Sequence, residues 1–134
     1  MRLEGPVTQV NKSAQQVYEA VNDVQRYKEF MPDAVSGFTT GQDFGMPWFS
    51  FAIGGMPQIK MVRNLAEPYT KVVFATPMGA KISLEVLISS LAPQQCGVQV
   101  VIEADVNPML RMMVERPLRR FLEDVSAKIA QVES

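Results

Sequence analysis

The spacing of apolar residues changes twice along the chain. From Ser13 to about Phe30 they recur every three or four positions, which is typical of amphipathic helices. From Val35 to Ala104 they recur at every second position, which is typical of strands with one covered face. After Asn107 the helical spacing returns. This order predicts an α+β fold in which two short helices precede a sheet and one long helix follows it.

Local signals predict where the short helices begin and end. Ser13 and Gln16 have the spacing of a capping box and predict a helix that starts at Ser13. The pair Asn22-Asp23 can cap a second helical segment that continues to Phe30. Pro32 ends that segment, because the residue before a proline is driven out of the helical region.

Six strands are predicted after the two short helices, and one short strand, Leu3–Val10, is predicted before these helices. The six are Val35–Thr40, Trp48–Ile53, Gln58–Leu65, Lys71–Thr76, Ala80–Leu91 and Val98–Ala104. The gaps carry glycine and proline, as in Pro77-Met78-Gly79 and Pro93–Gly97, and Cys96 is expected in the last of these turns. Connections this short favour an antiparallel sheet.

A long C-terminal helix is predicted from Pro108 to Val132. Asn107 is a suitable N-cap, Pro108 suits the first helical position, and no glycine follows. At about 1.5 Å per residue, this helix is long enough to cross the whole sheet. Pro117 lies inside it and is expected to bend it.

Composition narrows the possible chemistry. The 134 residues fit one domain, 1–134, and contain no histidine and a single cysteine. This excludes histidine-dependent catalysis, histidine-ligated zinc and internal disulfides, and we expect no metal and no cofactor. A net charge of -1 argues against nucleic acid as a partner. With no signal peptide or spanning segment, we expect a cytoplasmic protein without stable membrane insertion.

The chain resembles the START-like (SRPBCC) superfamily, which includes polyketide cyclases, lipid-transfer domains and coenzyme Q-binding proteins. The residues that carry this resemblance are Ser13, Val17, Tyr18, Val21, Asp23, Tyr27, Phe30, Pro32 and Val35. The segment from Asn107 to Leu118 is similar to the terminal helix of a small bacterial branch. The resemblance implies a helix-grip fold, in which a curved antiparallel sheet of about seven strands wraps around the long helix and encloses an apolar pocket.

The alternation of apolar and polar residues in the strands and the methionines of the last helix predict a ligand-binding site. Its predicted residues are Phe49, Phe51, Met61, Arg63, Phe74, Leu84, Val100, Met109, Met112 and Met113. Pockets for small ligands are mostly apolar, and methionine adapts to varied apolar shapes. A filled core would use the same residues. Arg63 has the inward parity and could bind a ligand carboxylate, but it could also reach solvent near its strand end.

Three functions remain open at this point. The leading hypothesis is a non-catalytic protein that binds or transports a lipid, quinone or isoprenoid. A cyclase or aromatase is the second, and it requires a polar side chain such as Arg63 or Tyr27 in the pocket. The third is an interaction module that uses its outer surface, including the arginines after Met109, where transient contact with a membrane surface is conceivable. The oligomeric state is not predicted.

Overall fold

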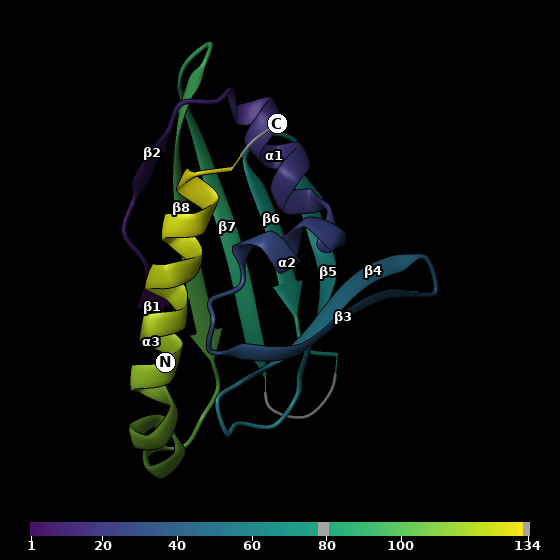
Figure 1. Cartoon of the computed structure of the whole chain (residues 1–134), viewed down its shortest axis with the longest axis vertical. Coiled ribbons are helices and arrows are strands. Elements are labelled where there is room, and N and C mark those ends of the chain that lie inside the picture. The colour runs from purple at the N-terminus through teal and green to yellow at the C-terminus, as the bar shows by residue number, and fades with distance from the viewer. Residues whose placement is uncertain (78–80, 133–134) are drawn as a thin grey trace.

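A curved antiparallel sheet forms one layer of the molecule, and the helices cover its concave face (Figure 1). The computed structural model describes residues 1–77 and 81–132. The strands are β1 (Arg2–Glu4), β2 (Thr8–Val10), β3 (Val35–Asp43), β4 (Met46–Ile53), β5 (Ile59–Glu67), β6 (Lys71–Ala75), β7 (Ile82–Ala92) and β8 (Gln95–Ala104). The helices are α1 (Ala14–Asn22), the 3₁₀ turn η1 (Val24–Arg26), α2 (Tyr27–Phe30) and α3 (Pro108–Ala130).

The strand order is β1-β8-β7-β6-β5-β4-β3, and β2 also pairs with β8. Every pairing is antiparallel. The predicted helix-grip fold is therefore confirmed, with the two short helical segments between the N-terminal strands and the meander. The predicted turn Pro77-Met78-Gly79 and the predicted strand start at Ala80 lie partly outside the described residues.

The predicted first strand is interrupted at Gly5, where α3 comes close. Leu3 pairs with Ile102 and Thr8 with Val98, so both halves add to the same neighbour, β8. A Cβ on Gly5 would lie 3.0 Å from the Ser126 hydroxyl oxygen of α3 and 3.0 Å from a backbone oxygen of β8. The missing side chain thus lets the helix pack directly against the edge of the sheet.

The predicted helix starts are confirmed by their hydrogen bonds. The Gln16 amide donates to the Ser13 hydroxyl at 3.1 Å, and the Ser13 amide donates to the Gln16 side chain at 3.0 Å. The Asp23 carboxylate accepts from Gln25 at 3.0 Å at the start of η1. The Asn107 side chain accepts from the Leu110 amide at 2.8 Å at the start of α3.

The hairpin of β3 and β4 is longer than predicted and projects from the body of the sheet (Figure 1). Both strands continue to a two-residue turn, in which Phe44 and Gly45 have φ values of 53° and 80°. Residues such as Gly41 and Asp43 are weak strand formers, so the sequence pattern ends too early. Cross-strand pairing extends the ladder through them.

The expectation that Cys96 lies in a turn is wrong. Strand β7 turns directly into β8 at Pro93 and Gln94, because Ala92 already pairs with Gln95. Cys96 therefore lies within β8, opposite Val10 and Ser90, and its side chain is fully buried. Burial raises the pKa of its thiol.

Candidate functional site

An apolar cavity of about 510 Å³ lies at one end of the molecule, between the sheet and the first half of α3. Helix α3 contributes Leu110, Met113, Val114 and Leu118, and the connection between β4 and β5 contributes Met56 and Pro57. The remaining lining residues are Gly55, Gln58, Ile59, Lys60, Thr76, Pro77, Ile82, Ala104 and Val106. The size and the largely apolar lining are those of a site for a small organic molecule.

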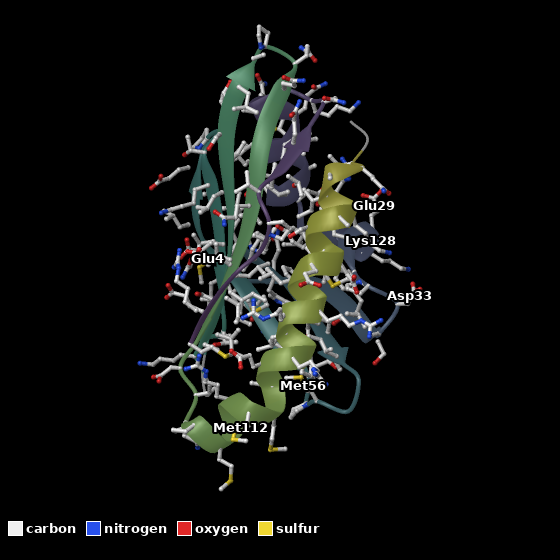
Figure 2. The ribbon with its side chains drawn as sticks, turned by 90° about the vertical axis from the view of Figure 1, so that its left-hand side faces the viewer. Glu4, Glu29, Asp33, Met56, Met112 and Lys128 are labelled. Atoms are coloured by element: carbon white, nitrogen blue, oxygen red, sulfur yellow. The ribbon has the colours of Figure 1, made fainter. Side chains whose placement is uncertain are left out.

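The cavity exists because the two halves of α3 pack differently. The buried described residues of α3 all lie from Leu118 onward, where they press against the sheet and α2. The preceding positions Pro108–Met113 are all exposed. Pro117 lies at this boundary and has no amide hydrogen to donate to the preceding turn. Figure 2 shows the lower turns of α3 at an angle to the rest of the helix, as the proline predicts.

The middle of the molecule, in contrast, is filled by aromatic rings. Tyr27 stacks on Phe49 with the ring centroids 4.6 Å apart, and Phe74 meets both rings edge-on at 5.0–5.1 Å. Phe51 stacks on Phe121 of α3 at 5.3 Å. Between this cluster and the cavity lies a void of only about 20 Å³. A void of this size holds about one water molecule, so it leaves no room for an organic ligand.

The structure separates the predicted ligand-binding residues into five groups. Met113 lines the cavity. Phe51, Met61 and Leu84 line the small void. Phe49, Phe74 and Val100 are fully buried in the core. Arg63 lies beside the end of α1, and Met109 and Met112 are exposed at the tip of α3. Ligand contact by these residues stays a prediction, which the cavity does not require of Met109 and Met112, since neither of them lines it.

Two polar side chains that could have served a cyclase make structural hydrogen bonds instead. The Arg63 guanidinium donates to Asn22, the last residue of α1, at 2.8 Å to the side-chain oxygen and 3.3 Å to the carbonyl. The Tyr27 hydroxyl donates to the Val21 carbonyl at 2.7 Å inside the core. Burial raises the pKa of this hydroxyl far above its ordinary value, so it stays protonated.

The polar side chains at the cavity also have partners. Gln58 donates to the Gly37 carbonyl and to the Ser50 hydroxyl, each at 2.9 Å. Lys60 forms an ion pair with Asp43, and its ammonium lowers the pKa of that carboxyl group. The same ammonium lies 4.5 Å from the centre of the Trp48 ring. These groups hold the β3, β4 and β5 strands together at the rim.

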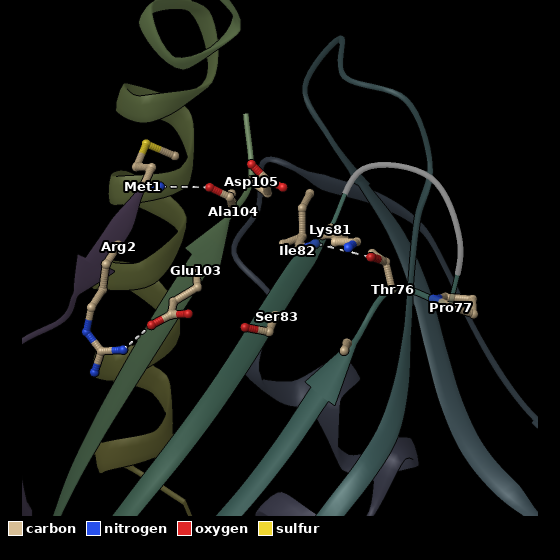
Figure 3. Close-up of a pocket in the computed structure, with 11 residues that line it drawn as sticks. Met1, Arg2, Thr76, Pro77, Lys81, Ile82, Ser83, Glu103, Ala104 and Asp105 are labelled. Carbon is tan, nitrogen blue, oxygen red and sulfur yellow. Dashed lines mark hydrogen bonds and ion pairs between the residues drawn. The ribbon is translucent and has the colours of Figure 1, made fainter. Parts of the chain in front are cut away.

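A second pocket, of about 680 Å³, lies at the open end of β7 and β8 (Figure 3). Its lining includes Arg2, Lys81, Glu103 and Asp105, so it is strongly charged. Arg2 forms ion pairs with Glu4 and Glu103, and these pairs neutralise part of the charge in the pocket. Although this pocket is larger, its polarity suits an apolar ligand less well than the cavity beneath α3.

Sequence reasoning missed Met56 as a cavity residue. Met56 lies between glycines and a proline, in a segment whose composition predicts only a turn. An apolar side chain in such a turn was the available signal. Within residues 1–77 and 81–132, no group of three acidic, cysteine or histidine side chains could hold a metal ion. No helix in the same part of the chain is long and apolar enough to cross a membrane.

The fold defines a helix-grip protein, and an apolar cavity lies at one end of it. Residues 10–129 match the sequence profile of the family described as polyketide cyclase / dehydrase and lipid transport, and the chain belongs to this family. No protein of curated function matches the sequence.

Solved structures with the same fold come from plants and bacteria. Truncated norcoclaurine synthase from Thalictrum flavum has a TM-score of 0.72 at 12% identity, over 98% of this chain and 91% of that one. A START superfamily protein from Mycobacterium smegmatis has a TM-score of 0.69 at 15% identity, over 98% and 99%. The Zhui aromatase/cyclase from a Streptomyces species also has a TM-score of 0.69 at 15% identity, over 98% and 94%. At these identities the likeness shows the fold alone.

Proposed function

We propose that this protein binds and carries a small apolar molecule, such as a lipid, quinone or isoprenoid, in the cavity beneath the first half of α3. The observation that carries the proposal is the cavity of about 510 Å³ with its mostly apolar lining. Since the neighbouring core is filled by aromatic rings, this space is a defined feature of one end of the fold. The lipid-transport members of the family agree with this function.

A binding function is favoured over a cyclase activity because the polar side chains near the cavity are engaged in hydrogen bonds or ion pairs. Among the described residues that line the cavity, the ionisable one is Lys60, and it is paired with Asp43. Tyr27 and Arg63 are engaged elsewhere in the fold. A cyclase would need an acid or base free to move a proton on the ligand.

Native mass spectrometry of the protein purified from its own host tests the proposal directly. We expect a stoichiometric mass increment that organic extraction removes and that the extract identifies as an apolar compound. A dye titration with N-phenylnaphthylamine supplies a second readout. Saturable binding of one dye per protein is expected for an apolar cavity of this size.

A pair of matched variants locates the bound molecule. Val114→Trp places a large ring in the cavity and should abolish dye binding, because Val114 lines it. Met112→Trp introduces the same ring on an exposed, already apolar position of the same helix and should leave binding unchanged. Circular dichroism confirms that both variants fold. Equal dye binding by the two variants would place the ligand elsewhere and refute the proposal.

A further inference from the structure

The first turns of α3 expose an unusual group of large apolar side chains. Met109, Met112 and Met113 are 77%, 85% and 70% exposed, and Leu110 beside them is also exposed. We call these four residues the methionine tip. Figure 2 shows Met112 at the lower end of the molecule, pointing away from the sheet. Single exposed apolar residues are common, but four within five positions form a patch that indicates a binding surface.

The methionine tip continues into the mouth of the cavity. Leu110 and Met113 belong to both, since they also line the cavity beside Val114. Whatever the tip binds therefore lies next to the cavity. An apolar ligand that passed from apolar surroundings at the tip into the cavity would not have to cross water.

A band of arginines follows the methionine tip along the helix. Arg111, Arg116, Arg119 and Arg120 are all exposed, and Glu115 is the acidic residue among them. Glu115 lies within 3.6 Å of Arg111 and 4.0 Å of Arg119, so one carboxylate serves two guanidinium groups. The chain as a whole carries a net charge of -1, which makes this positive region a local feature.

The spacing of the two groups matches the layers of a membrane surface. Met109, Met112 and Met113 share a helical face with Arg116, which lies on the same side of Pro117. At about 1.5 Å per residue, Arg116 lies about 6 Å behind Met112 along the axis of these turns, and Arg120 follows beyond the bend at Pro117. Amphipathic helices that lie on a membrane bury their apolar face about 5–10 Å into the boundary between headgroups and acyl chains, and we take the same depth for the inserted tip of α3. The arginines would then reach the phosphate layer.

We propose that the methionine tip and the arginine band dock this protein on an anionic lipid bilayer, from which the cavity takes up its ligand. This inference rests on the proposed function for the identity of the cargo. The positive end of the α3 dipole points the same way as the tip and adds to the attraction for anionic lipids. A second copy of the chain fits less well, because symmetric contact through this surface would bring arginine against arginine.

Vesicle flotation with the full chain tests the docking. We expect binding to phosphatidylcholine vesicles that contain phosphatidylglycerol, and weak binding to pure phosphatidylcholine or at high salt. The double variant Met109→Gln, Met112→Gln should bind about tenfold or more weakly, because it removes the inserted apolar side chains. Arg116→Gln combined with Arg120→Gln should weaken binding to the anionic vesicles only.

Two control variants lie far from the tip. Leu91→Gln changes an apolar side chain that is 60% exposed near the turn between β7 and β8, and should leave flotation unchanged. Lys28→Gln removes an exposed positive charge on α2 and should also have no effect. All exchanged side chains are exposed, so each variant is expected to fold.

The outcomes separate docking from ligand binding. Val114→Trp should lose the dye but still float with vesicles, whereas Met109→Gln, Met112→Gln should bind the dye from solution but not float. If the wild type does not float, or floats as well on neutral vesicles, or if the methionine variant floats like the wild type, the docking proposal is wrong. Concentration-dependent dimers that the methionine variant abolishes, without flotation, would assign the surface to self-association and also overturn it.

Discussion

Phe44 adopts a backbone conformation that suits glycine and asparagine better than an aromatic residue. Its φ of 53° lies in the left-handed region, and its side chain is completely exposed at the end of the β3–β4 hairpin. Exposure means that no packing within the described part of the chain offsets this strain. The hairpin turn itself requires positive φ at both central positions, which is why Gly45 follows.

Phe44→Asn should therefore stabilise the protein. Asparagine tolerates the left-handed region and forms the preferred turn pair with Gly45, so we expect the free energy of unfolding to rise by about 1 kcal/mol. Urea denaturation followed by circular dichroism measures this change. Met46→Asn, in the same hairpin but without positive φ, is the control and should not stabilise. A loss of stability in Phe44→Asn would mean that the ring makes a contact worth more than the strain.

Arg63 holds the end of α1 against the sheet. Its guanidinium donates to both oxygens of Asn22, where a positive charge also favours the negative end of the helix dipole. Arg63→Ala should lower the free energy of unfolding by about 1.5 kcal/mol, because hydrogen bonds from a charged donor are lost.

Dye binding decides whether Arg63 has a second role. Arg63 is not among the described residues that line the cavity, so we expect Arg63→Ala to bind N-phenylnaphthylamine with unchanged affinity. Arg116→Ala, which removes an exposed arginine, is the stability control. Loss of dye binding at unchanged stability would show that Arg63 takes part in ligand binding, as its inward parity in the strand predicts.

At the scale of elements, helix starts were predictable and strand ends were not. The caps Ser13, Asp23 and Asn107 act on backbone groups two or three residues away, so the local sequence contains the whole signal. The end of β3 and the start of β8 depend instead on backbone pairing with β4 and β7, which forms only when the hairpins fold. Cys96 was misplaced for this reason, because a glycine after it resembled a turn.

The close packing of α3 on the sheet depends on Gly5. Gly5→Ala should lower the free energy of unfolding by about 1–3 kcal/mol, since the new Cβ would meet a backbone oxygen that cannot rotate away. Gly55→Ala is the matched control, because no described atom lies within 4 Å of its Cβ position. Thermal and urea denaturation compare the two. Equal stability would show that α3 can shift without cost.

At the scale of the whole molecule, the fold divides the tasks of stability and binding. The aromatic cluster and the second half of α3 fill one part, while the first half of α3 leaves the other part open. The apolar alternation of the strands predicted the covered face but not this division. Filled and open regions use the same residue types, and the different packing of the two halves of α3 distinguishes them.

The rate at which Cys96 is labelled can show whether ligand binding stabilises the whole fold. Its thiol is buried in β8, and its raised pKa further reduces the reactive thiolate. Labelling by a thiol reagent should therefore require unfolding. If the cavity binds its ligand only in the folded state, a concentration of about 100 times Kd should slow labelling about 100-fold when refolding outpaces the reagent. Val114→Trp, which blocks the cavity, should show no such protection. Labelling that is fast and independent of ligand would instead reveal local opening of the short strand β2, which covers Cys96 through its pairing with Val10.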